Sequence, residues 1–192
     1  KWVGRAKHTL RKYPLRSAYL MGLMYYGYQI SWLRGIRSSE LTDGSLAKII
    51  GLLPFIIATT TFALTLPLFV WLYGRLKIRS DRIRFLFVTP LLWVLSESLI
   101  SIVFSIVSSG VGARIGDYWH FGNVGLALAG TSLVYLSRWG GLYLLSYTAV
   151  LIMCTIVYCV KAKKPLPLLV VIAGVVALNV LAFQLYKTPR GK

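Results

Sequence analysis

An apolar run over residues 83–106 contains a single carboxylate, Glu97, and this combination strongly limits what the chain can fold into. The run is long enough to cross a bilayer as a helix, which needs about 20 apolar residues. A charge at the bilayer centre costs roughly 2.5–3.5 kcal/mol on insertion scales, and no Lys or Arg lies within one helical turn of Glu97. Glu97 must therefore face other helices, a water-filled cavity or a polar partner, or stay protonated. At spacings of four residues, Trp93, Glu97 and Ser101 share one helix face, which we predict to be the inside of the protein.

The composition predicts an all-α, polytopic membrane protein. The chain is 57% hydrophobic and 14% charged, more apolar than a soluble domain of this size requires. In lipid every backbone polar group must be bonded within the protein, and a helix achieves this by itself. The net charge of +17 does not indicate nucleic acid, because the basic residues lie in loops between apolar segments. Such residues orient a membrane protein and contact anionic headgroups, so we expect a membrane partner and no nucleic acid.

About five spans are predicted within a single transmembrane domain over residues 1–192: residues 17–33, 49–73, 83–106, 142–160 and 166–186. Tyr25, Tyr26 and Tyr28 in the first span suit a membrane interface. Pro54 and Pro67 predict a kink in the second. Residues 124–136 are too few to span and are typical of a re-entrant or interfacial segment, and residues 137–141 predict a turn. Because the chain starts with Lys rather than Met, we expect it to be a fragment of a longer parent or a processed chain.

The sequence contains no self-contained active site. HExxH, GxSxG and Walker motifs are absent, and so is a Cys/His cluster. Cys154 and Cys159 lie five residues apart in one apolar segment, a poor spacing for a disulfide or a metal pair, so we expect small buried apolar residues there. We therefore predict no catalytic residue, no metal ligand and no cofactor in this chain.

Four segments resemble, in order and spacing, motifs of the membrane domain of apolipoprotein N-acyltransferases. They are Ser17-Ala-Tyr-Leu-Met-Gly-Leu-Met-Tyr-Tyr-Gly-Tyr-Gln-Ile-Ser-Trp32, Pro90-Leu-Leu-Trp-Val-Leu-Ser-Glu97, Trp119-His-Phe-Gly122 and Gly140-Gly-Leu-Tyr-Leu-Leu-Ser146. Each motif is weak alone, and the four in order are moderately specific. Two positions depart from the family pattern: Ile100 stands where the family has Arg after its Glu, and Tyr118 where it has Pro.

The resemblance implies the membrane module of an enzyme that moves an acyl chain from phospholipid to the N-terminal Cys of a lipoprotein, in the bacterial cytoplasmic membrane. The family's chemistry lies in a nitrilase-like domain with a Glu, a Lys and a nucleophilic Cys, which would follow the last span. Phospholipid and, through that further domain, a lipoprotein are the implied partners. Two alternatives remain open. A small transporter or channel would show paired broken helices or several buried charges, and a passive membrane anchor would show no shaped groove.

Six residues are candidates for a lipid or substrate cavity: Trp93, Glu97, Ser101, Tyr118, Trp119 and His120. In the functional interpretation Glu97 is a polar anchor lining a lipid-access cavity, and Tyr118 and Trp119 gate acyl-chain entry. In the alternative interpretation Glu97 is a packing residue hydrogen-bonded to a hydroxyl of the second span, such as that of Thr60 or Thr61. The loop aromatics then belong to an interfacial belt, and His120 is a solvated loop residue.

The first prediction concerns orientation. Alternate loops carry 14 Lys and Arg residues against 8, so the N-terminus should be cytoplasmic and the C-terminus external. In single-Cys variants of a Cys-free background, His120→Cys should react with an impermeant thiol reagent in intact cells. Lys163→Cys should react only after the membrane is opened. Labelling of position 163 from outside would reverse the assignment.

Overall fold

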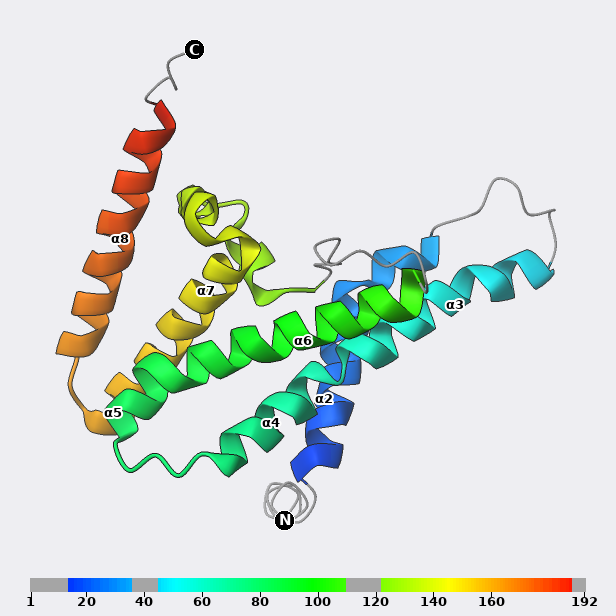
Figure 1. The fold of residues 1–192 in the computed structure, drawn as a ribbon, viewed down its shortest axis with the longest axis horizontal. Helices are drawn as coiled ribbons and strands as arrows, with labels where there is room; N and C mark the ends of the chain where they lie inside the picture. The colour runs from blue at the N-terminus through cyan, green and yellow to red at the C-terminus, as the bar shows by residue number, and fades with distance from the viewer. Residues whose placement is uncertain (1–13, 36–44, 110–121, 188–192) are drawn as a thin grey trace. The chain divides into compact units, whose positions relative to one another are not determined.

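The computed structural model describes residues 14–35, 45–109 and 122–187, and every regular element in these ranges is helical (Figure 1). The elements are α2 (Pro14–Gln29), η1 (Ser31–Gly35), α3 (Ser45–Phe62), α4 (Thr65–Arg75), α5 (Asp81–Ile83), η2 (Arg84–Val88), α6 (Thr89–Ser109), η4 (Val124–Leu128), η5 (Ser132–Leu136), α7 (Ser137–Ala162) and α8 (Leu166–Lys187). The predicted all-α class is confirmed.

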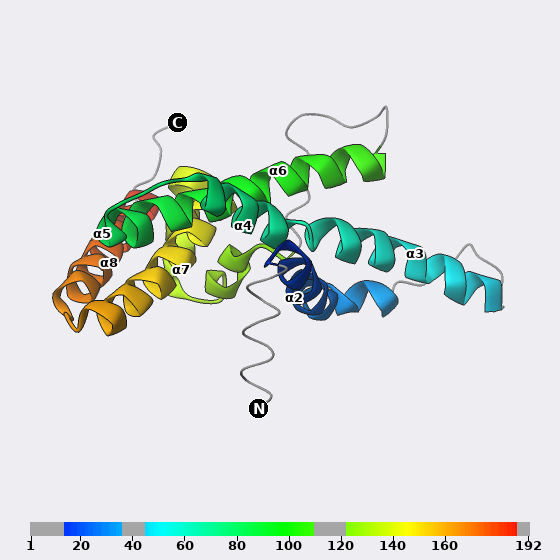
Figure 2. The ribbon, with the colours of Figure 1, turned by 90° about the horizontal axis from the view of Figure 1, so that it is seen from below.

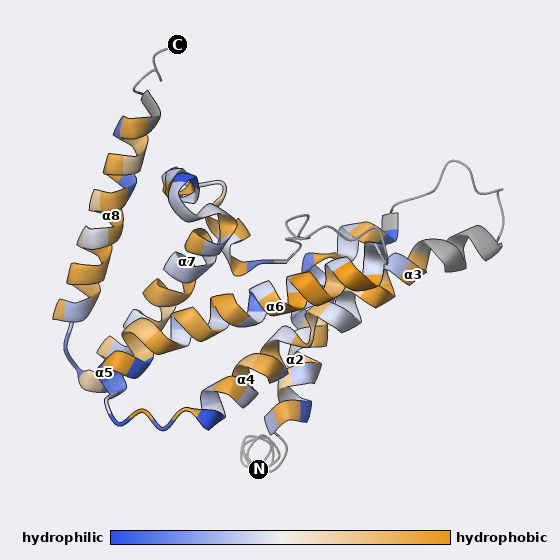
Figure 3. Ribbon diagram, in the orientation of Figure 1, coloured by the Kyte–Doolittle hydropathy of each residue, from blue (hydrophilic) through white to orange (hydrophobic). Residues whose placement is uncertain are grey.

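Four helical stretches of the described chain are long and apolar enough to cross a membrane: Leu52–Arg75, Asp81–Ser109, Ser132–Ala162 and Leu166–Leu185. They correspond to the second to fifth predicted spans, and Figure 3 shows how apolar residues dominate them. The first predicted span corresponds to α2, which has 16 residues, followed by the 3₁₀ helix η1. The protein is therefore a multi-pass helical membrane protein.

The chain divides into two compact units, and each is described by itself. Unit 1 comprises residues 1–75 and 96–122, and unit 2 comprises residues 76–95 and 123–192, so the division falls within α6. The arrangement of the whole chain as one domain stays a prediction.

In unit 1, Pro67 explains the break between α3 and α4. A proline inside a helix has no N–H to donate, and its ring clashes with the carbonyl four residues earlier, which here belongs to Ala63. The α3 helix ends at Phe62 and α4 begins at Thr65, so the kink predicted from Pro67 is present as a break, whereas Pro54 lies within α3. The α2 helix packs against α4, as both views show (Figures 1 and 2). A Cβ atom on Gly22 would lie 2.5 Å from the Ala63 carbonyl oxygen, so this close approach requires a glycine.

The core of unit 1 is a row of aromatic rings from three helices. The rings of Tyr26 and Phe62 stack with centroids 5.8 Å apart, and Phe62 and Phe104 follow at 4.8 Å. Gly122 packs directly on the ring of Tyr26, because a Cβ atom on this glycine would lie 2.7 Å from Cδ1 of Tyr26. Its φ of +77° is also a conformation that glycine adopts without strain. Gly122, the last residue of the third motif, thus packs against α2.

In unit 2, the segment 124–136 packs on α7 as two short 3₁₀ helices. The Gly125 N–H donates to Ser146 Oγ at 3.0 Å, which uses the final serine of the fourth motif. The predicted turn at residues 137–141 is present as non-helical backbone at Gly140 and Gly141 inside α7. The α7 and α8 helices pack against each other and are joined by a short turn at Lys163, whose φ is +53°.

The second prediction tests the contact between Gly22 and Ala63. Gly22→Ala should lower the free energy of unfolding by about 1–3 kcal/mol, because the new methyl group meets backbone that cannot move aside. Gly74→Ala is the matched control, since a Cβ atom there meets nothing within 4 Å and alanine favours a helix. Unfolding in mixed micelles measures both. Equal stability of the two variants would show that the α2 contact is not tight.

Candidate functional site

A polar strip runs along the buried face of α6. Ser96, Glu97, Ser101 and Ser105 are each at most 4% exposed. Glu97, Ser101 and Ser105 follow one another at spacings of four residues and share one side of the helix, and Ser96 directly precedes Glu97. Trp93 lies one turn before Glu97 on α6 and is half-buried. Glu97 and Ser101 are therefore buried, as predicted for this face, and contact of this face with lipid or substrate stays a prediction.

Glu97 lies near α2 within unit 1. The Glu97 carboxyl group is close enough to the phenol groups of Tyr25 and Tyr26 to interact with both electrostatically. Tyr26 is 1% exposed and belongs to the aromatic core, whereas Tyr28 is 82% exposed. The expectation that all three tyrosines are interface residues is thus wrong for Tyr26. Tyr26 is a site residue that the sequence did not single out, because adjacent tyrosines look alike until the rotation of the helix is known.

The buried hydroxyl groups of the second predicted span belong to different threonines than expected. Thr60 is exposed, and its Oγ1 donates back into α3, to the carbonyl oxygens of Ile56 at 2.7 Å and Ile57 at 3.1 Å. The expectation that Thr60 bonds to Glu97 is therefore wrong. Thr59 and Thr65 are the buried threonines of this stretch. Within the described residues, the hydroxyls of Thr59 and Ser101 have no hydrogen-bond partner.

The three loop candidates, Tyr118, Trp119 and His120, lie outside the described residues. The first described residue after them, Gly122, packs on the ring of Tyr26.

The two cysteines lie inside α7, as the sequence predicts. Cys159 is buried and Cys154 is half-buried, and both are free thiols. In the part of the chain that the structure describes, no group of three His, Cys, Asp or Glu side chains could hold a metal ion. Neither cysteine is therefore an exposed thiol.

The sequence profile of the apolipoprotein N-acyltransferase N-terminal domain matches residues 2–155. The chain belongs to this family. All four motifs that carry the resemblance lie within the matched range, while α8 lies beyond it. No curated protein and no solved structure matches the chain. The polar strip of α6 and the Gly122 contact are therefore features of an apolipoprotein N-acyltransferase N-terminal domain.

The third prediction concerns the protonation of Glu97. Glu97→Gln should be mild, because the amide also donates and accepts hydrogen bonds at a site 2% exposed. Glu97→Lys should destabilise by about 3 kcal/mol or more, because it buries an ammonium group with no other acid on α6. Glu97→Leu is the uncharged comparison, and it should cost little in stability because it adds no charge to the buried site. Thermal unfolding in detergent compares the variants. Gln as damaging as Lys would show that the site needs the ionised carboxylate.

Proposed function

We propose that this chain is the membrane-embedded module of an enzyme that transfers an acyl chain from phospholipid to the N-terminal Cys of a lipoprotein in the bacterial cytoplasmic membrane. The observation that carries the proposal is the family match over residues 2–155. The four long apolar helical stretches support it, because the proposed acyl donor is a phospholipid of the membrane.

The chemistry of acyl transfer indicates which domain carries the nucleophile. A thiol attacks an ester as the thiolate, which needs an exposed, electropositive setting. Cys154 and Cys159 lie within an apolar helix and lack such a setting. We therefore assign the nucleophile to the nitrilase-like domain of the family. The role of the present chain is to hold the acyl donor and present its ester to that domain.

Buried polar side chains of α3 and α6 in unit 1 supply groups for this role. A phospholipid that enters between helices brings ester carbonyls, which accept hydrogen bonds and donate none. The hydroxyl groups of Thr59 and Ser101 are buried donors with no partner in the described chain, and a protonated Glu97 would be a third donor. Tyr118 and Trp119 are proposed to gate entry of the acyl chain.

The fourth prediction separates the module from the catalyst. The purified chain, incubated with phospholipid and a diacylated lipopeptide, should form neither a thioester nor a triacylated product. The full-length parent protein should form both, as detected by mass spectrometry. Product from the chain alone would refute the assignment of the nucleophile elsewhere. Absence of product from the parent, with its thiol intact, would refute the acyl-transfer function.

In the parent, Thr59→Val with Ser101→Ala should lower the rate of thioester formation by removing two donors to the ester. Thr60→Val with Ser98→Ala removes the same number of hydroxyl groups and is the control, because Thr60 is exposed and bonds to its own helix. If both pairs lower the rate of thioester formation equally, the hydroxyl groups of Thr59 and Ser101 do not hold the acyl donor.

A further inference from the structure

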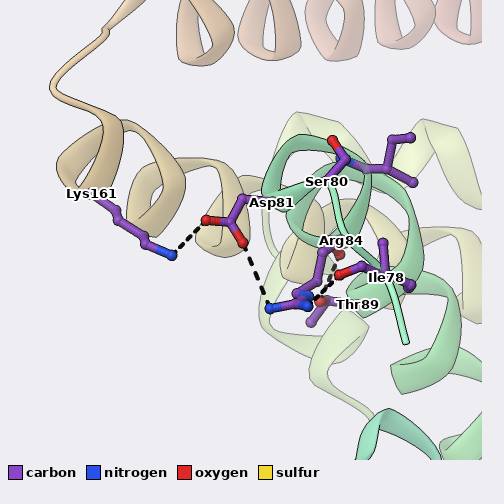
Figure 4. Close-up of polar contacts among 7 residues, drawn as sticks. Ile78, Ser80, Asp81, Arg84, Thr89 and Lys161 are labelled. Atoms are coloured by element: carbon purple, nitrogen blue, oxygen red, sulfur yellow. Dashed lines mark hydrogen bonds and ion pairs between the residues drawn. The ribbon is translucent and has the colours of Figure 1, made fainter. Parts of the chain in front are cut away.

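Two basic segments that are far apart in the sequence meet in unit 2. Lys161 Nζ, near the end of α7, lies 2.6 Å from Asp81 Oδ2, and Asp81 Oδ1 lies 3.6 Å from Arg84 Nη1 (Figure 4). The Lys161 ammonium group also lies 5.8 Å from the centroid of the Phe85 ring. These contacts hold the segment 77–84 against the C-terminal end of α7.

The cations at this junction far outnumber its acids. Asp81 is the only acidic residue in unit 2. Seven basic residues surround it in the two segments, and we name them the basic end: Lys77, Arg79, Arg82, Arg84, Lys161, Lys163 and Lys164. All of these except Arg84 are exposed. Five of the seven make no ion pair within the described part of the chain, so a strong positive charge is left for a partner.

The backbone that carries these cations is fixed rather than free. The Ser80 hydroxyl accepts a hydrogen bond from the Ile83 N–H and caps α5. The Arg84 guanidinium donates to the carbonyl oxygen of Ile78 (Figure 4). Lys163 adopts a left-handed conformation, and its N–H donates to the Cys159 carbonyl to close α7. Groups that are already ordered lose less entropy when a ligand binds, so this arrangement favours a specific site.

Exposed apolar side chains continue from the basic end along the same helices. Ile83, Phe87 and Leu91 follow one another at spacings of four residues and are each more than half exposed. Val160 and Leu166, beside the turn between α7 and α8, are also exposed. In Figure 3 the hydrophilic residues gather at α5 and at this turn, and the helices beyond them are apolar. The cationic side chains match the headgroup phosphate of a phospholipid, and the exposed apolar side chains match its acyl chains.

We propose that the basic end binds the headgroup phosphate of an anionic phospholipid whose acyl chains lie along this apolar face. Arg and Lys form charge-assisted hydrogen bonds with phosphate oxygens, and clustered basic residues next to a membrane helix favour anionic lipids. A zwitterionic lipid carries no net charge to match the surplus. Inorganic phosphate would meet the same cations without using the apolar face. The site lies in unit 2, and it does not depend on the proposed acyl transfer.

The test uses the whole chain in detergent, titrated with phosphatidylglycerol and followed by native mass spectrometry, with phosphatidylcholine and inorganic phosphate as separate arms. Arg79→Gln/Lys163→Gln/Lys164→Gln removes three cations of the basic end. Lys187→Gln/Arg190→Gln/Lys192→Gln removes the same charge from the other end of α8 and beyond, and is the matched control. Thermal unfolding of both variants checks that each is folded.

Each basic residue near an anionic surface strengthens binding about fivefold at low salt, so the first variant should bind phosphatidylglycerol roughly tenfold to a hundredfold more weakly. The control variant should bind it within about twofold of the parent chain, and phosphatidylcholine binding should be equal in all three. Equal losses in both variants would show that only total charge matters. Displacement of the lipid by millimolar inorganic phosphate would show that the apolar face contributes nothing. Either result would overturn the proposal.

Discussion

The contact of Gly22 with the backbone of Ala63 is the interaction on which unit 1 depends. Pro67 lies four residues after Ala63, and the helix breaks at Ala63 and Leu64, which leaves a short stretch of backbone that α2 can approach closely. Small residues drive such packing in lipid, where burial of apolar surface gives little advantage. Four residues after Gly22, the same approach places Tyr26 in the aromatic core and next to Glu97. One proline and one glycine therefore position the surroundings of the buried acid.

The buried acid is tolerated because its surroundings are polar. Three serines share its face of α6, and two tyrosines of α2 lie near its carboxyl group. Each serine also has its own backbone within reach, as Ser105 Oγ shows by donating to the Ser101 carbonyl at 2.9 Å. A helix face with this many hydroxyl groups is expensive to bury in lipid and inexpensive to bury against other polar groups. The strip therefore fixes which side of α6 faces inward.

Sequence reasoning located the helices better than it located their faces. The apolar runs, the break near Pro67 and the turn at Gly140 and Gly141 all followed from length and from backbone chemistry. The choice of Thr60 over Thr59, and the placing of Tyr26 at an interface, failed for one reason. In a soluble helix apolar residues mark the inner face, but lipid and protein core are both apolar, so a membrane helix such as α2 or α3 shows no clear periodicity. Only the polar strip of α6 was distinct enough to predict its own orientation.

At the start of α6, in unit 2, Pro90 is preceded by a π-helical turn. Pro90 is buried and would clash with the Leu86 carbonyl in a regular helix. The chain avoids the clash with the wider π-helical turn η2, in which the Arg84 carbonyl accepts from the N–H and, at 2.8 Å, from the hydroxyl of Thr89. The Arg84 side chain meanwhile bonds to Asp81 and to Ile78. Arg84 thus joins the polar segment to the apolar helix, and Phe87 and Leu91, which flank Pro90 in the sequence, are both exposed.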